Sequence, residues 1–349
     1  PPPPPPPPPP PTHPPTPENY TQVNSSAASD VYKRQPHGPF SPRAPSRRVR
    51  FGKDDRAIVT RLLTFDTEDG RRWDALLYRP RRGSTSRRRL AVIVVHGSVG
   101  NYLTGVPRTV SFGLAGAGFT VLSINTRMSY YGVFFGGGLM HKTPLDIDAA
   151  VALMRRLGYR RIALCGFSMG ATMVTNYQAQ VQPDGVVGVC TMAHPASLPV
   201  SLRRRWGQFG ATPTSDEVAE SARERLFPDP ERSPNDRILI VRRATGWSDA
   251  PLDAEIWTYR TWWFSRGPEA PHAESRQRIG GVSVPLAIIQ AGHDELMEES
   301  EGAELAGLAR MGDAPAVYLD SIDGANHVFD GYDGQLLDAA VSWLDEIVE

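Results

Sequence analysis

Ser168 lies in the pentapeptide 166–170, Gly-Phe-Ser-Met-Gly, which has the pattern G-x-S-x-G. The apolar residues 161–165 before it predict a buried strand, and residues 169–180 after it predict a helix. So tight a strand-to-helix turn strains the serine backbone and raises its hydroxyl above the sheet. The free N–H groups and dipole of the helix N-terminus favour negative charge there. This context favours a nucleophilic serine over an ordinary glycine-rich turn.

His327 is the candidate base, because a serine hydroxyl is a poor nucleophile without one. On a strand–turn–helix scaffold of this kind the partners follow in the order serine, acid, histidine. His327 lies in the predicted loop 324–329, between a predicted strand at 316–319 and the last predicted helix at 334–348. We therefore expect its imidazole to lie above the sheet, beside Ser168.

Asp294 is the preferred acid, because it directly follows the predicted strand 285–290. Active sites of open α/β sheets lie outside the carboxyl ends of their strands. An aspartate there can orient the histidine and stabilise its charged form. Glu295, Asp320 and Asp323 are the rival acids. His293 and Asp294 have no third ligand at a suitable spacing, so no metal site is predicted.

The loop that begins His96-Gly97-Ser98 follows an apolar strand predicted at 90–95. Acyl transfer needs N–H donors aimed at the oxyanion that forms on the carbonyl oxygen. The N–H of Met169 and the N–H of Ser98 are the candidates for this oxyanion hole. His96 precedes the acid in the chain, so we interpret it as a structural brace of its loop.

The elements around these residues predict an α/β fold with a mostly parallel central sheet and helices on both faces. An antiparallel hairpin, 57–65 with 73–78, comes first. The later predicted strands are 90–95, 119–124, 161–165, 186–190, 285–290 and 316–319, and the predicted helices are 107–117, 144–157, 169–180 and 334–348.

Three segments are predicted. Residues 57–194 and 285–349 form the core, whereas 195–284 form a helical cap or lid insertion with helices near 216–227 and 253–266. Trp257, Trp262 and Trp263 of this insertion line the substrate pocket in one interpretation and form the insertion's own core in the other. Residues 1–50 form a proline-rich disordered arm. Residues 25–35 resemble translated sequencing-adaptor sequence, which suggests an artefactual origin for 1–35.

Composition excludes several classes of protein. The chain has 349 residues, two cysteines and 38 residues each of Lys+Arg and Asp+Glu. A disulfide scaffold is thereby excluded, and no apolar run approaches the ~20 residues of a membrane span. Residues 1–90 hold 17 basic and 8 acidic side chains. We interpret the arginines as lying in solvated linkers rather than on a surface for nucleic acid or anionic membrane. No signal peptide is apparent, so a cytoplasmic location is expected.

Together, the loop at His96, the pentapeptide around Ser168, and Asp294 and His327 resemble the α/β-hydrolase superfamily over roughly residues 57–349. The resemblance implies an α/β-hydrolase fold and a Ser168–His327–Asp294 triad that needs no cofactor. It also places a cap domain at 195–284. The function expected is hydrolysis of a small-molecule carboxylic ester or thioester. An acyltransferase, a peptidase or a catalytically silent binding protein are the alternatives.

Overall fold

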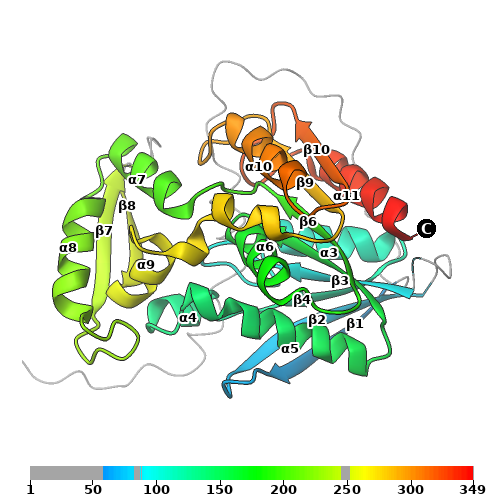
Figure 1. The fold of residues 1–349 in the computed structure, drawn as a ribbon, viewed down its shortest axis with the longest axis horizontal. Coiled ribbons are helices and arrows are strands. Elements are labelled where there is room, and N and C mark those ends of the chain that lie inside the picture. Colours follow the sequence, from blue (N-terminus) through cyan, green and yellow to red (C-terminus); the bar gives the residue numbers. More distant parts are fainter. Residues whose placement is uncertain (1–57, 82–86, 88, 245–251, 349) are drawn as a thin grey trace, which may run out of the picture. The chain divides into compact units, whose positions relative to one another are not determined.

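An eight-stranded sheet, in the order β1-β2-β4-β3-β5-β6-β9-β10, is the centre of the fold (Figure 1). The computed structural model describes residues 58–81, 87, 89–244 and 252–348. The strands are β1 (Ile58–Asp66), β2 (Arg72–Pro80), β3 (Leu90–Val95), β4 (Thr120–Ile124), β5 (Arg161–Phe167), β6 (Val186–Met192), β9 (Leu286–Ala291) and β10 (Val317–Ile322). All neighbours from β4 to β10 pair in parallel, whereas β1–β2 and β2–β4 are antiparallel. The predicted fold class is confirmed.

The antiparallel hairpin of β1 and β2 closes through a turn that its residue types explain. The Thr67 hydroxyl donates to Asp69 at 2.6 Å, and the Gly70 N–H donates to the Thr67 carbonyl at 2.9 Å. Gly70 has a φ of 77°, which glycine adopts without strain. The hairpin thus extends the parallel sheet at one edge.

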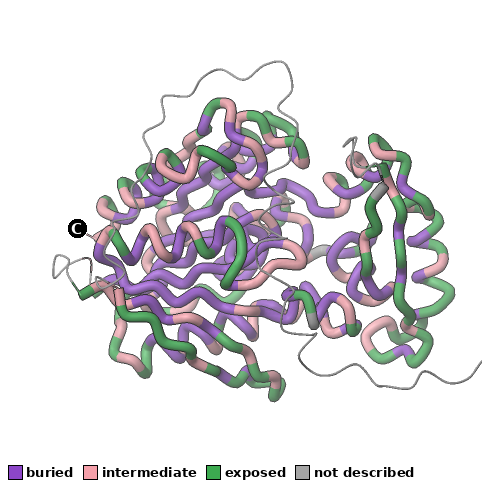
Figure 2. Tube along the Cα trace, turned by 180° about the vertical axis from the view of Figure 1, so that it is seen from behind, coloured by how far each residue is buried: buried purple, intermediate pink, exposed green. Residues whose placement is uncertain are grey.

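Strand β3 divides the core into two halves. Its six residues are all fully buried, and alternate side chains point to opposite faces. Leu90, Val92 and Val94 pack with α3 (Gly105–Gly116) and α11 (Asp333–Val348), whereas Ala91, Ile93 and Val95 pack with α5 (Thr143–Arg156) and α6 (Met169–Val181). Figure 2 shows this buried centre running along the strands. An apolar run without alternation therefore marks a strand covered on both faces.

The insertion predicted to be helical also contains a second sheet. It holds α7 (Leu198–Gln208), α8 (Ser215–Leu226), α9 (Tyr259–Arg266), and the antiparallel strands β7 (Ile238–Ala244) and β8 (Leu252–Thr258). The helix predicted at 253–266 is therefore wrong over its first half. Along β7 the buried residues Leu239 and Val241 alternate with exposed ones, which is the period of a strand with one covered face. Of the aromatic residues in 253–266, Trp257 lies in β8 and the others lie in α9.

Helix α7 was not predicted. Neither were α4 (Tyr130–Phe134), α10 (Ser300–Met311) and the short 3-10 turns Met140–Lys142, Pro271–Ala273, Ser275–Gln277 and Ile279–Gly281. The other predicted elements occur with ends shifted by at most a few residues. The arm predicted at 1–50 lies outside the described residues. Within the described part of the chain, every helix is too short or too polar to cross a bilayer.

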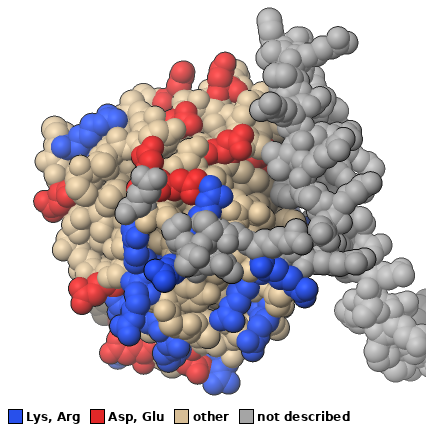
Figure 3. Space-filling view, turned by 90° about the vertical axis from the view of Figure 1, so that its right-hand side faces the viewer, with Lys and Arg blue, Asp and Glu red and all other residues tan. Residues whose placement is uncertain are grey.

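Charges of both signs share the face shown in Figure 3, which is the side away from the insertion in Figure 1. Basic side chains gather in the lower part of this view and acidic ones mainly above. Among the described residues, Arg87 pairs with the Asp345 carboxylate and donates to the Ala117 carbonyl at 2.7 Å. The described part of this face is therefore not a surface of one sign.

Candidate active site

Ser168 occupies a strained turn between β5 and α6. Its φ is 54° and its ψ is −123°, in a region that non-glycine residues rarely adopt. Two glycines allow the approach of helix and strand that this turn needs. A Cβ on Gly166 would lie 2.3 Å from the Gly170 carbonyl oxygen, and a Cβ on Gly170 would lie 2.4 Å from that of Val95. The glycines of the pentapeptide are thus steric requirements of the turn.

His327 reaches Ser168 from the loop after β10, as the chain order predicts. Its Nε2 lies 3.0 Å from the Ser168 Oγ, and its Nδ1 lies 2.8 Å from Oδ2 of Asp294. The His327 backbone N–H donates to Glu295 at 3.0 Å, which holds the loop against the end of β9. Both the His327 and Asp294 side chains are under 10% exposed. A hydroxyl, an imidazole and a carboxylate therefore form one continuous chain of hydrogen bonds.

Asp294 is itself held in place by backbone donors. Its Oδ1 accepts hydrogen bonds from the N–H groups of Leu296 at 2.8 Å and Met297 at 3.1 Å. This leaves Oδ2 directed to the imidazole. Among the rival acids, Glu295 accepts from the backbone N–H of His327, and Asp320 accepts from the Tyr318 hydroxyl. The geometry thus favours Asp294 as the partner of the imidazole.

His96 braces the loop after β3. The backbone N–H of Thr126 donates to its Nε2 at 3.2 Å, so the ring proton lies on Nδ1, which donates to the Gly97 carbonyl at 2.7 Å. Complete burial lowers the pKa of His96 to about 4, because the charged ring would lose its hydration. His96 is therefore neutral and contacts neither Ser168 nor Asp294.

The same loop passes directly beside Ser168. A Cβ on Gly97 would lie 3.1 Å from the Ser168 Cβ, and the next residue but one, Val99, has a φ of 52°. Ser98 stands between them and is partly exposed. Met169 is the first residue of α6, so its N–H has no acceptor within the helix. Both predicted N–H donors thus belong to segments that adjoin the Ser168 side chain.

A pocket opens beside the serine, and its wall comes from both the core and the insertion. It is lined by Ser168, Pro195, Leu198, Ser201, Leu202, Arg205, Arg266, Leu296, Met297 and His327. The three tryptophans named above are buried and are not among these residues; Trp257 lies behind Arg266, with its ring centre 5.6 Å from the guanidinium carbon. Sequence reasoning missed both arginines, because neither occurs in a motif.

Similarity to known proteins agrees with this fold. A family model described as the alpha/beta hydrolase family matches residues 92–329, which is more than half of the chain. The chain belongs to the alpha/beta hydrolase family. No curated protein sequence gave a significant match.

Solved structures resemble this alpha/beta hydrolase at low sequence identity. A hypothetical protein from Pseudomonas aeruginosa has a TM-score of 0.61 and 18% identity, covering 88% of this chain and 99% of its own. Est1E from Butyrivibrio proteoclasticus, solved with ferulic acid, has a TM-score of 0.55 and 16% identity, and the match covers 82% of this chain and 99% of Est1E. The esterase domain of a Rhodothermus marinus protein has a TM-score of 0.53 and 17% identity, and the match covers 83% of this chain and 100% of that domain. At such identities these likenesses establish the fold.

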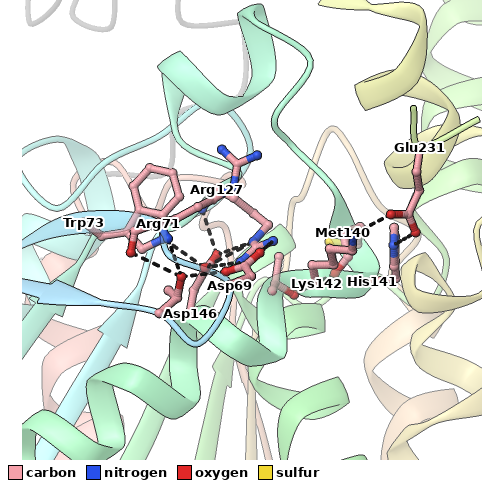
Figure 4. Close-up of polar contacts among 11 residues, drawn as sticks. Asp69, Arg71, Trp73, Arg127, Met140, His141, Lys142, Asp146 and Glu231 are labelled. Atoms are coloured by element: carbon pink, nitrogen blue, oxygen red, sulfur yellow. Dashed lines mark hydrogen bonds and ion pairs between the residues drawn. The ribbon is translucent and has the colours of Figure 1, made fainter. Parts of the chain in front are cut away.

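A buried ion-pair network fixes the segment after β4 of this alpha/beta hydrolase (Figure 4). The Arg127 side chain is fully buried and binds Asp146 at 2.8 Å and Asp69 at 3.0 Å. Asp146, also fully buried, accepts from the Trp73 indole at 2.9 Å and from the Arg127 backbone at 2.8 Å. Sequence analysis assigned Arg127 no role, since its partners lie in a turn and a helix that only the fold brings together.

A second polar contact in Figure 4 joins the core to the insertion. His141 and Lys142, in the 3-10 turn before α5, both bind the Glu231 carboxylate, the histidine at 2.7 Å. His141 also packs against the Phe264 ring of α9, with ring centres 4.6 Å apart. These contacts hold the insertion against the core at the N-terminal end of α5.

Neither the two cysteines nor a metal-ligating cluster forms a further site among the residues that the structure describes. Cys165 and Cys190 are adjacent in β5 and β6, buried and free. The hydrogen bond with the Cys190 thiol and, after it, burial raise the pKa of Cys165, so it is not a reactive thiolate. Within the described residues, no three His, Cys, Asp or Glu side chains are grouped so that they could hold a metal ion.

Proposed function

We propose that this alpha/beta hydrolase cleaves a carboxylic ester or thioester through an acyl-enzyme intermediate on Ser168. The observation that carries the proposal is the pair of contacts made by His327, at 3.0 Å to the Ser168 Oγ and 2.8 Å to Asp294. Both lie within hydrogen-bond reach in a site that adjoins a pocket.

The proposed reaction begins when Nε2 of His327 takes the Ser168 proton and the Oγ attacks the carbonyl carbon. The carbonyl oxygen becomes an oxyanion, which the N–H groups of Ser98 and Met169 stabilise. The tetrahedral intermediate then collapses, and the imidazolium gives its proton to the departing alcohol or thiol. Water, deprotonated by the same histidine, attacks the acyl carbon. The bond to the Ser168 Oγ then breaks, the imidazolium returns its proton to that oxygen, and the acid is released. Asp294 keeps the proton of the neutral ring on Nδ1 and stabilises the imidazolium.

We further propose that residues 195–284 form a cap over the site, with 57–194 and 285–349 as the catalytic core. Two observations support this division. Pro195, Leu198 and Arg266 of the insertion line the same pocket as Ser168 and His327. The insertion also begins after β6 and returns to the sheet at β9, so it leaves the order of the core strands undisturbed.

Hydrolysis of p-nitrophenyl acetate, butyrate and octanoate by the full chain tests the proposed reaction. Turnover by the wild type that is lost in Ser168→Ala would support it, and the chain-length preference would reveal the size of the acyl pocket. A folded wild-type protein that hydrolyses none of the three and forms no covalent adduct would favour the silent binding protein. Adding an alcohol acceptor and identifying the products distinguishes an acyltransferase from a hydrolase.

A further inference from the structure

Arg266 is a buried cation in the wall of the pocket. Arg266 is the last residue of helix α9 and is only 9% exposed. It makes no ion pair with any described residue. Its Nη1 contacts the Met169 sulfur at 3.7 Å and donates to the Ser265 carbonyl at 3.2 Å. A guanidinium has five N–H donors, so most of its hydrogen-bonding capacity is not used by these contacts.

The charges around Arg266 leave one positive charge without a counterpart. Arg205 also lines the pocket, but its guanidinium binds Glu255 at 2.8 Å. Arg243 binds the same Glu255 at 2.8 Å and Asp253 at 3.2 Å. Three guanidinium groups thus share two carboxylates, and both carboxylates are engaged by the other two arginines.

Burying a cation in this way is costly unless an anion accompanies it. The desolvation lowers the pKa of Arg266 to about 9, so the group is still charged at neutral pH. Trp257 covers the guanidinium on one side, with its ring centre 5.6 Å from the Cζ. The Met169 contact places it beside the first residue of α6, whose N–H is the proposed oxyanion donor.

We propose that Arg266 binds a carboxylate carried by the substrate, so that this protein acts on esters or thioesters that bear a free carboxylate. This inference rests on the proposed function and narrows its substrate class. A planar guanidinium pairs with a carboxylate through two parallel hydrogen bonds, and the pairing is strongest where water is excluded. Leu198, Leu202 and Leu296 line the same pocket and would contact the carbons between the ester and the carboxylate.

Two matched pairs of esters test this inference. Mono-p-nitrophenyl glutarate carries its charge in the acyl part and is compared with p-nitrophenyl pentanoate; 4-butyryloxybenzoate carries it in the alcohol part and is compared with phenyl butyrate. We expect the wild type to prefer one charged ester over its neutral partner by roughly 10- to 100-fold in kcat/KM, the scale of a charged hydrogen bond. Which pair shows the preference identifies the part of the substrate that Arg266 binds.

Arg266→Met should remove that preference, and Arg266→Lys should restore part of it. Arg242→Met is the control, because Arg242 is an exposed residue of β7 and does not line the pocket; it should keep the wild-type ratio. Equal rates on both esters of each pair in the wild type, or a preference that survives in Arg266→Met, would overturn the inference while leaving the proposed hydrolysis intact.

A binding measurement separates this inference from failure of the proposed reaction. Glutarate should raise the Tm of the Ser168→Ala protein, which cannot turn over an ester, and should leave the Tm of Ser168→Ala/Arg266→Met unchanged. Without glutarate, the Arg266→Met protein should be at least as stable as the wild type, since a buried charge is replaced by an apolar group. An equal glutarate effect on both proteins, or none on either, would contradict a carboxylate site at Arg266.

Discussion

Nδ1 of His327 lies 2.8 Å from Oδ2 of Asp294, although 33 residues separate them in the chain. The aspartate follows β9 and the histidine follows β10, and these two strands are parallel neighbours in the sheet. Their carboxyl ends therefore bring the two side chains together. The other carboxylate oxygen is occupied by the N–H groups of Leu296 and Met297. Oδ2 is thereby held in a fixed orientation toward the imidazole.

Asp294→Asn should lower kcat by about 10³- to 10⁴-fold while the protein stays folded. The amide matches the carboxylate in shape, but it neither holds the correct tautomer nor stabilises the imidazolium. Steady-state hydrolysis of p-nitrophenyl butyrate measures the effect. Asp320→Asn is the matched control, because Asp320 lies in β10 and contacts Tyr318 instead of His327. A larger loss in the control than in Asp294→Asn would move the acid role to Asp320.

Arg127→Met should destabilise the protein by about 3–5 kcal/mol. Removing one partner of a buried ion pair leaves the other charge unpaired, and both Arg127 and Asp146 are fully buried. Urea unfolding of wild type and variant gives the difference. Arg72→Met is the control, since the Arg72–Asp66 pair is exposed, and it should leave the unfolding midpoint nearly unchanged. Equal midpoints for wild type and Arg127→Met would show that the network contributes little.

Gly170→Ala should prevent normal folding, because its Cβ would lie 2.4 Å from a carbonyl oxygen of β3, in backbone that cannot move aside. Gly116→Ala is the matched substitution. Gly116 lies in α3, is exposed and has open space around the Cβ position, so alanine should stabilise the helix by about 0.5–1 kcal/mol. The soluble yield and the Tm of each variant are compared with those of the wild type. A Gly170→Ala protein with wild-type Tm and activity would refute the steric account of the turn.

Stability should fall as the pH drops from about 6.5 toward 4. His96 has a folded pKa of about 4, below its unfolded value, so the unfolded chain binds a proton first as the pH is lowered. Protonation of His96 would also put a hydrogen on Nε2, which now accepts a hydrogen bond from the backbone N–H of Thr126. Two N–H groups would then point at each other. Urea unfolding at pH 6.5 and pH 5.0 measures the free energy of unfolding at each pH. Between these pH values it should fall by about 1–2 kcal/mol less in His96→Gln than in the wild type. Identical pH dependence in both proteins would contradict the neutral, buried state of His96.

Sequence patterns predicted the core elements closely because local signals coincided there. The apolar run of β3, the glycines around Ser168 and the order of the candidate residues each indicate one structure. Other features depend on contacts between distant segments. Strand β8 has one aromatic residue, Trp257, and is followed directly by the aromatic residues of α9. Only its pairing with β7 shows that it is a strand. Arg127 has ion-pair partners that lie far away in the sequence. Arg266 has no ion-pair partner among the described residues. The residues next to each arginine in the sequence indicate neither fact.

The most direct test of Ser168 as the nucleophile is reaction of the full chain with diethyl p-nitrophenyl phosphate, which phosphorylates activated serines and releases p-nitrophenolate. Peptide mass spectrometry then locates the adduct, and the released p-nitrophenolate gives its stoichiometry. We predict one diethylphosphoryl group per chain on Ser168, loss of ester hydrolysis in parallel with its formation, and no adduct in Ser168→Ala. An adduct on a different residue, or ester hydrolysis that persists after Ser168 is fully modified, would contradict the account.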